Sequence, residues 1–330
     1  MLDLAIVAEG RTSADALAET TALARRADAL GFRRFWVAEH HNMASVASTS
    51  PAVLMAHLAA TTERIRVGSG GVMLPNHPPL VVAEQFALLE ALHPGRVDLG
   101  IGRAPGTDPA TAAALRRSPE GLGAEDFPRH LVDLLGLLGD RRAEHGLWER
   151  FRATPVATGA PEVVLLGSSG YSAQLAGLLG LRFAFAHHFD TGGTLDAVEL
   201  YRRSFEPSAG LDAPHVIVTA AVLAADTDDA AEWFAGPGRL SLLARRTGRL
   251  LPLQSPEDAA GHPDLATARA LATSRIVGGP DAVVVGLRAL ADATGADELM
   301  VSTSTHGLPE RIRSLEVLAE AWTAGPATNP

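Results

Sequence analysis

The sequence predicts an α/β fold in which eight parallel strands, each followed by a helix, close into a (β/α)8 TIM barrel. Short runs rich in β-branched residues alternate with longer amphipathic segments, which is typical of a parallel sheet covered by helices. The 330 residues exceed the roughly 250 of a typical barrel, which leaves room for insertions at its C-terminal face. We therefore expect a single domain over residues 1–330. A doubly wound open sheet shows the same alternation and remains an alternative at this point.

The expected strands are short and evenly distributed along the chain: Leu2–Val7, Arg34–Ala38, Ile65–Leu74, Arg96–Gly102, Glu162–Leu166, Arg182–Ala186, His215–Leu223 and Glu298–Ser302. The expected helices cover about Ser13–Leu30, 51–60, 78–92, 125–138, Tyr171–Leu179, Thr194–Phe205, Pro280–Ala293 and Pro309–Trp322. Gly31 follows the first helix, and a glycine commonly ends a helix there. Three stretches break the rhythm and are expected to be irregular insertions: about 104–124, 140–161 and 236–272.

The composition excludes several classes of site and partner. The chain has no cysteine and its 28 basic residues are all arginine, which excludes disulfides, thiolate metal sites, cysteine nucleophiles and catalytic lysines. The net charge of −10 disfavours nucleic acid and anionic membranes as partners. No apolar run is long enough to span a bilayer, and no basic segment precedes the first apolar run. We therefore expect a cytoplasmic, water-soluble protein.

Residues directly after the strands are the candidates for chemistry, because a barrel site lies at the carboxyl ends of its strands. Glu39-His40-His41-Asn42 follows the second strand. Adjacent residues on extended backbone point to opposite sides, so at most one of the two histidines faces the barrel mouth. A histidine there can exchange a proton with a reacting oxygen. A hydrogen-bonded structural histidine is the alternative, and the spacing does not favour a metal site.

Two glycine-containing segments follow or end the next strands. Gly68-Ser69-Gly70-Gly71-Val72 indicates close approach of another group, such as a flat ring, to the backbone, or a kink that barrel curvature requires. Gly100-Ile101-Gly102-Arg103 is a weak dinucleotide-binding signal, since the loop after it does not open a helix. Arg103 is better placed to bind an anion.

A third segment, Gly167-Ser168-Ser169-Gly170-Tyr171-Ser172, joins a strand to a helix. Successive amides at a helix start, flanked by hydroxyls, can cradle a phosphate without lysine; an ordinary N-cap turn is the alternative. Together with Arg103, this segment would bind a phosphomonoester. His187 and His188 follow the sixth strand, where they could line a substrate cavity or cap a loop.

At these residues the chain resembles the bacterial luciferase-like flavin-dependent monooxygenases. The segments AEHHN at 38–42, VGSGGVMLPNHPP at 67–79 and EQFALLEALHPGR at 84–96 resemble the alkanal-monooxygenase-like subgroup. The resemblance implies a homodimeric barrel that binds FMN, reduced by NAD(P)H through a separate, transiently bound flavin reductase. Reaction with O2 to a C4a-peroxyflavin would then oxidise a small organic substrate.

The resemblance also implies roles for the matching positions. His40 falls at the catalytic histidine of the family, and Gly70-Gly71 at its non-prolyl cis peptide. The flavin would contact Glu39, Ser69, Gly70, Gly71 and Val72, with its phosphate on Arg103 and Gly167, Ser168, Ser169, Gly170, Tyr171 and Ser172. His41, His187 and His188 would contact the substrate, and no metal is expected. Gly102 replaces the reactive cysteine of the luciferases, so no role of that thiol applies here.

Two other functions remain open from the sequence. A deazaflavin-dependent reductase uses the same barrel for hydride transfer, and the arginine-only, alanine-rich composition suggests a GC-rich genome, in which deazaflavins are often made. A non-catalytic flavin-binding protein is the second alternative. The EHH segment and the glycine-rich strand favour FMN over deazaflavin.

Overall fold

The computed structural model describes residues 1–104, 107–116, 125–189, 191–249 and 251–324. Its parallel strands curl into one sheet with the path β1-β2-β3-β5-β6-β7-β8-β10, in which β4 also pairs with β5 and β9 with β8. Strands β1 and β10, at the two ends of this path, contact each other. The strands are β1 Leu2–Asp3, β2 Arg34–Val37, β3 Arg66–Ser69, β4 Val72–Met73, β5 Val97–Gly102, β6 Glu162–Gly167, β7 Arg182–Phe185, β8 Val216–Ala224, β9 Ile276–Gly278 and β10 Glu298–Ser302. The α/β fold with a curled parallel sheet is confirmed.

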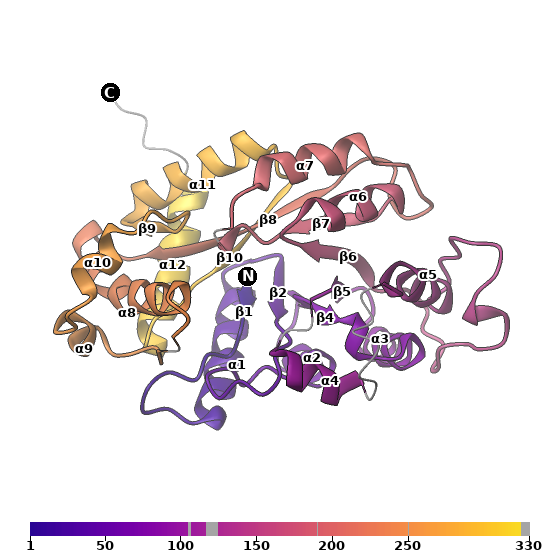
Figure 1. Cartoon of the computed structure of the whole chain (residues 1–330), viewed down its shortest axis with the longest axis horizontal. Helices are drawn as coiled ribbons and strands as arrows, with labels where there is room; N and C mark the ends of the chain where they lie inside the picture. Colours follow the sequence, from indigo (N-terminus) through magenta and orange to yellow (C-terminus); the bar gives the residue numbers. More distant parts are fainter. Residues whose placement is uncertain (105–106, 117–124, 190, 250, 325–330) are drawn as a thin grey trace.

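The helices lie around the outside of the sheet (Figure 1). They are α1 Ser13–Ala29, α2 Pro51–Ala60, α3 Pro79–Leu92, α4 Pro109–Arg116, α5 Phe127–Leu137, α6 Gly170–Leu178, α7 Thr194–Arg203, α8 Asp228–Arg246, α9 Pro256–Ala260, α10 Leu265–Ala270, α11 Pro280–Thr294 and α12 Leu308–Ala324, with short 3-10 turns η1 Leu74–Asn76, η2 Leu147–Glu149 and η3 His187–Phe189. Helix α1 begins at a reciprocal capping box between Thr12 and Asp15, which satisfies two amides of the first turn. No helix among the described residues is both long and apolar enough to cross a membrane.

The structure corrects four sequence expectations. The expected strand Ile65–Leu74 is interrupted by a cis peptide between Gly70 and Gly71 and becomes β3 and β4. The stretch 236–272 is not irregular, because α8 continues through Pro237 and is followed by α9 and α10. Strand β9 was not expected at all. In the stretch 104–124, α4 forms a helix and residues 105–106 and 117–124 lie outside the described residues; 140–161 contains only η2.

Charged residues at the amino ends of the strands form a network across the bottom of the sheet. Arg34, at the start of β2, is 2% exposed and lies 2.8 Å from Asp98, 2.9 Å from Glu298 and 2.9 Å from Glu162. These carboxylates belong to β5, β10 and β6. Arg66 of β3 donates to the other oxygen of Asp98 at 2.8 Å. One guanidinium therefore connects strands from opposite ends of the sheet path.

The network lowers the pKa of Glu298 and Glu162. Burial alone would raise the pKa of Glu298, but hydrogen bonds from His215 and Arg34 hold that pKa well below its ordinary value. A carboxylate with a lowered pKa stabilises the folded state above its unfolded pKa, and this contribution decreases as the pH falls. The network is therefore a source of stability at neutral pH.

Replacing Arg34→Met tests this network. The substitution leaves Asp98 and Glu298 without their shared partner, so we expect the free energy of unfolding at pH 7 to fall by about 3–5 kcal/mol. The loss should shrink as the pH falls below about 4, near the ordinary pKa of a carboxyl group in the unfolded chain, because the stability that a lowered native pKa provides is lost in that range. Denaturant unfolding at both pH values measures it.

The matched control is Arg203→Met, since Arg203 forms an exposed ion pair with Glu199 on α7. Such surface pairs contribute about 0–1 kcal/mol. Equal losses for the two variants would contradict the role of Arg34.

Candidate functional site

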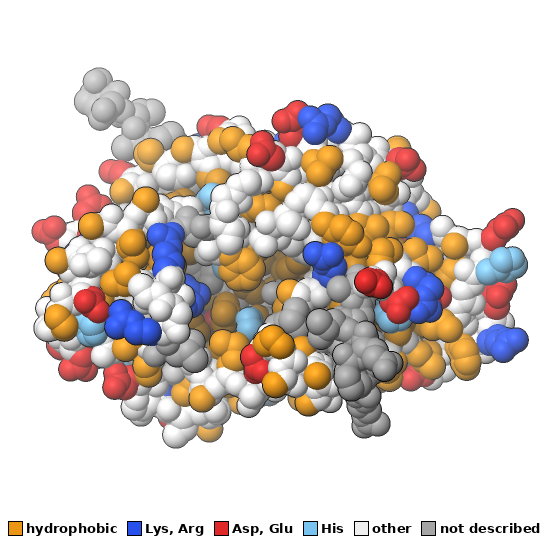
Figure 2. All heavy atoms as spheres, viewed as in Figure 1, with side chains coloured by type: hydrophobic (Ala, Val, Ile, Leu, Met, Phe, Trp, Pro, Cys, Tyr) orange, Lys and Arg blue, Asp and Glu red, His pale blue; other side chains and the backbone are white. Residues whose placement is uncertain are grey.

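A cavity of about 250 Å³ opens at the carboxyl ends of the strands. It lies between residues that follow β1, β2 and β7, the second half of β8, the end of β10 and one face of α8. Figure 2 shows a hollow near the middle of this face, with arginine side chains on its left side. Apolar side chains, among them Leu4, Ile6, Val46, Val222 and Val277, form much of its wall. The location agrees with the position expected for a site on this fold.

Two of the predicted histidines, His40 and His188, line this cavity. The Nδ1 atom of each is buried and has no hydrogen-bond partner among the described residues. Buried polar atoms nearly always have a partner, so a bound molecule is a natural partner for both. Desolvation lowers the pKa of His40, against the opposing charge of Glu39. Desolvation also lowers the pKa of His188 to about 4, so both rings are neutral at pH 7.

Glu39 and His41 lie on the opposite side of the backbone from His40, as the alternation predicts. Glu39 is fully buried and its Oε1 accepts hydrogen bonds of 2.8 Å from the Nε2 atoms of His41 and His77. Its Oε2 accepts from the amide of Met73 in β4 at 3.0 Å. Neither Glu39 nor His41 lines the cavity. Of these three predicted site residues, His40 therefore faces the cavity. Glu39 and His41 instead join the end of β2 to the segment after the cis peptide.

Electrostatics agree with this structural role for Glu39. Desolvation would raise the pKa of Glu39, but the hydrogen bond and charge of His77, followed by the hydrogen bond of His41, lower it. Glu39, His41 and His77 also offer three possible metal-ligand atoms within 4.8 Å of one another. Their mutual hydrogen bonds already account for that arrangement.

The glycines of the β3–β4 segment leave room for side chains and backbone of the neighbouring strands. A Cβ on Gly68 would lie 2.4 Å from the ring of Trp36, and one on Gly71 would lie 2.7 Å from the carbonyl oxygen of Gly100. A Cβ on Gly100 would lie only 2.0 Å from the carbonyl oxygen of Ser69. The Ser69 hydroxyl donates to the Gly100 carbonyl at 2.8 Å. At these positions, close packing of β3, β4 and β5 is sufficient reason for glycine.

Arg103 and the segment 167–172 lie together, as the sequence predicts. The Arg103 guanidinium stacks on the Tyr171 ring at 4.1 Å from its centroid, which places the residue after β5 at the first turn of α6. Ser172 is buried beneath Gly167, whereas Ser168 and Ser169 are exposed, and Ser169 is the N-cap without a side-chain capping bond. This group does not line the cavity described above.

His187 lies apart from the cavity. Its Nδ1 is 2.8 Å from the hydroxyl of Thr194, the first residue of α7. The structure thus brings His188 to the cavity, whereas His187 contacts the start of the next helix, in line with the loop-capping alternative.

Sequence reasoning missed the cavity residues on α8. Arg239, Ser241 and Arg245 of α8 line the cavity, together with Arg275 before β9, and Gly238, Ser241 and Arg245 follow helical spacing. Gly236-Pro237-Gly238 suggests a break, because an interior proline lacks a hydrogen-bond donor. The missed signal is Thr227 followed by Asp228 and Asp229: the Thr227 hydroxyl accepts from the Ala230 amide, as at a helix start.

The sequence comparisons identify the family. Residues 2–298 match the model of the luciferase-like monooxygenases. The chain belongs to this family. An Escherichia coli luciferase-like monooxygenase is 42% identical, covering 96% of this chain and 94% of that protein. The N-acetyl-S-alkylcysteine monooxygenase of Bacillus subtilis is 33% identical, covering 98% of both chains. The enzyme is therefore an oxidoreductase, and the family resemblance is confirmed.

Solved structures give the same fold. The crystal structure of apo-MsnO8 matches with a TM-score of 0.90 and 38% identity, covering 99% of this chain and 98% of that chain. At the level of fold alone, the FMN-bound oxygenating component of a Pseudomonas putida 3,6-diketocamphane monooxygenase matches with a TM-score of 0.73 and 20% identity, covering 100% and 98%. An F420-dependent secondary alcohol dehydrogenase matches at 0.65 and 14%, covering 94% of each chain. Both flavin and deazaflavin enzymes therefore share this fold.

Replacing Glu39→Gln tests the cluster around that carboxylate. The amide removes the charge that His41 and His77 share, so the free energy of unfolding should fall by about 1–3 kcal/mol. The exposed pair of Glu149 with His145 provides the matched control, and Glu149→Gln should change stability by less than about 1 kcal/mol. Similar small losses from both substitutions in denaturant unfolding would show that the cluster is not stabilising.

Replacing Gly100→Ala tests the packing of the strands. The new methyl group would overlap the Ser69 carbonyl, and we expect a loss of at least about 3 kcal/mol or failure to fold, since overpacking alone costs 1–3 kcal/mol. Gly102→Ala is the control, because its Cβ would lie 3.1 Å from the sulfur of the flexible Met73 side chain and no nearer than 3.9 Å to the Val72 carbonyl oxygen. Thermal unfolding compares the two. An unaffected Gly100→Ala variant would contradict the close approach.

Proposed function

We propose that this enzyme is an FMN-dependent monooxygenase, which uses O2 and FMN reduced by a separate flavin reductase to oxidise a small organic molecule. Family membership supports the reaction type, and the name of the Bacillus subtilis relative shows that a small thioether is a substrate in this family. The single observation that carries the proposal is the neutral, half-buried His40, which lines the cavity at the strand ends and whose buried Nδ1 has no hydrogen-bond partner among the described residues. A proton-exchanging side chain is thus placed where the fold puts its chemistry.

The residues present fit a flavin mononucleotide. Its phosphate needs a cation and amide donors, and Arg103 next to the first turn of α6 supplies both without lysine. Its ring needs an apolar surface with a few polar groups, and the cavity offers apolar walls together with the imidazole rings of His40 and His188. When bound, FMN would supply the electrons that activate O2.

The chain's own residues would do the rest. His40 would donate a proton to, or accept one from, an oxygen at the reacting centre, since a neutral imidazole can do either. Glu39 would hold the backbone beside it by tying β2 to Met73. The apolar wall would exclude water, which strengthens the hydrogen bonds of His40. His188 would contact the substrate. His41, bonded to Glu39, and His187, bonded to Thr194, would instead hold the surrounding backbone in place.

Replacing His40→Ala tests the proposal. The variant should bind FMN as the wild type does but should lose at least 10-fold in product formed per O2 consumed, because positioned proton transfer contributes about 10²–10⁴-fold in rate. Oxygen consumption, hydrogen peroxide release and product are measured with a flavin reductase, NADH and a panel of small aldehydes, ketones and thioethers. His145→Ala, at an exposed ring, is the control.

Three results would contradict the proposal. Unchanged coupling in the His40→Ala variant would remove His40 from the chemistry. Binding of reduced F420 with hydride transfer and no O2 uptake would favour the deazaflavin reductase. FMN binding without turnover of any member of the panel would favour a flavin-binding protein.

A further inference from the structure

The charge of the cavity is opposite to that of the whole chain. The protein carries a net charge of −10, yet among the described residues that line the cavity three are arginine and none is aspartate or glutamate. Serine hydroxyls from α8 and from the end of β10 lie beside them. The cavity therefore combines an apolar wall with a positively charged, hydroxyl-bearing side.

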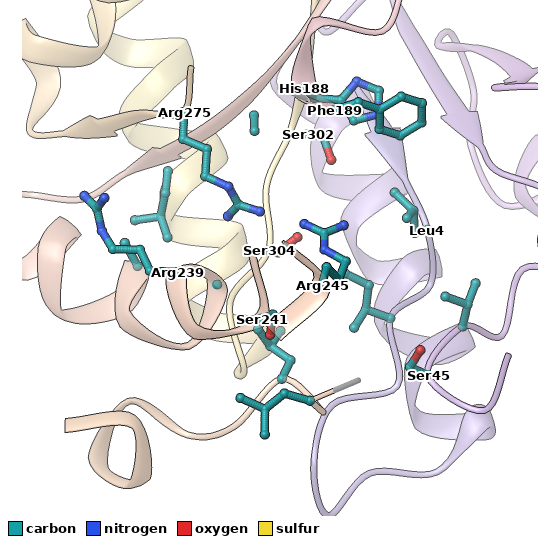
Figure 3. A pocket seen from close by; sticks show the side chains of 18 of the residues that line it. Leu4, Ser45, His188, Phe189, Arg239, Ser241, Arg245, Arg275, Ser302 and Ser304 are labelled. Atoms are coloured by element: carbon teal, nitrogen blue, oxygen red, sulfur yellow. The ribbon is translucent and has the colours of Figure 1, made fainter. Parts of the chain in front are cut away.

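The three arginines are not equivalent. Arg239 donates to Glu232 at 2.5 Å and is thereby neutralised. Arg245, two turns further along the chain from Gly238, has no ion-pair partner among the described residues. Figure 3 shows the guanidinium groups of Arg245 and Arg275 directed toward the space near Ser304, whereas Arg239 points away from it. An anion in this space would meet two guanidinium groups.

Local structure supports the position of these groups. A Cβ on Gly238 would lie 2.9 Å from Nη1 of Arg275, so the glycine in α8 leaves room for that guanidinium. Ser241, on the same face of α8, has a buried hydroxyl oxygen without a partner among the described residues. Desolvation and then the charge of Arg246 lower the pKa of Arg245. Arg245 is nevertheless exposed, so an anion from solution can reach its guanidinium and would offset the neighbouring charge of Arg246.

We propose that the substrate carries a carboxylate, which Arg245 and Arg275 bind near Ser304, while its apolar remainder lies along the wall toward His188. Guanidinium groups match a carboxylate with paired hydrogen bonds. The proposal deepens the proposed function and rests on it for the reaction. It concerns a substrate group rather than the flavin phosphate, because Arg103 and α6 lie outside this cavity.

The test compares hexanoate with hexanamide, which have the same shape and differ in charge. Isothermal titration of the flavin-free protein should show hexanoate bound at least 10-fold more tightly, which corresponds to about 1.4 kcal/mol. The Arg245→Gln variant should lose this preference and keep its affinity for hexanamide. The control Arg249→Gln removes an exposed arginine paired with Asp264 and should keep the preference. Circular dichroism checks that both variants fold.

Titration with FMN and with riboflavin distinguishes the anions. Arg245→Gln should bind FMN as the wild type does, whereas Arg103→Gln should bind it at least 10-fold more weakly. Equal binding of acid and amide, no binding of either, or a preference that survives Arg245→Gln would overturn the proposal. Weaker binding of FMN, but not riboflavin, by Arg245→Gln would assign the site to the flavin phosphate. If the wild type bound hexanoate but no FMN, the proposed function would fail and the anion site would stand.

Discussion

Arg34 is the residue on which the arrangement of the sheet most depends. It begins β2, yet its guanidinium reaches carboxylates on β5, β6 and β10, so one side chain connects strands that are far apart along the sheet path. Arg66 of β3 shares Asp98 with it, and Trp36 donates to the same carboxylate at 2.8 Å. Because these contacts lie at the amino ends of the strands, paired charges hold that end of the curled sheet together. The carboxyl ends are left free to form a site.

At the carboxyl ends of the strands, the alternation of side chains along extended backbone determines which residues face the cavity. Glu39 and His41 point to one side and form hydrogen bonds within the protein, while His40 between them faces the cavity. A shift of one residue would exchange these roles, since the side-chain period of a strand is two. The backbone bond from His40 to the Ser48 carbonyl at 3.0 Å helps to fix the register. The buried carboxylate therefore determines which histidine is available for chemistry.

The strands could be predicted from the sequence, because apolar runs alternate regularly with helical segments. The residues directly after the strands could be placed at the same edge of the sheet for the same reason. It predicted that His40 or His41 would face the mouth and that Arg103 would meet the start of α6, because both follow from strand ends that share one edge. It could not predict α8. Gly236, Pro237 and Gly238 break a helix in most contexts, and here tertiary packing buries all three within one. Because this helix was not predicted, its cavity residues Arg239, Ser241 and Arg245 were not predicted either.

The charges at the two ends of the sheet have different partners. The charges at the amino ends are paired within the protein and stabilise the fold, whereas those at the carboxyl ends lie at the proposed binding site. At the bottom, the desolvation of Arg34 is offset by carboxylates at hydrogen-bond distance, which is the condition under which a buried charge is tolerated. At the mouth, Arg245 lies beside an apolar wall, and no carboxylate of the described chain compensates it. Arg245 is exposed to solvent, so its charge can be met by a molecule that enters the cavity. The proposed carboxylate would supply the opposite charge there, while the apolar remainder of the substrate would pack on the wall.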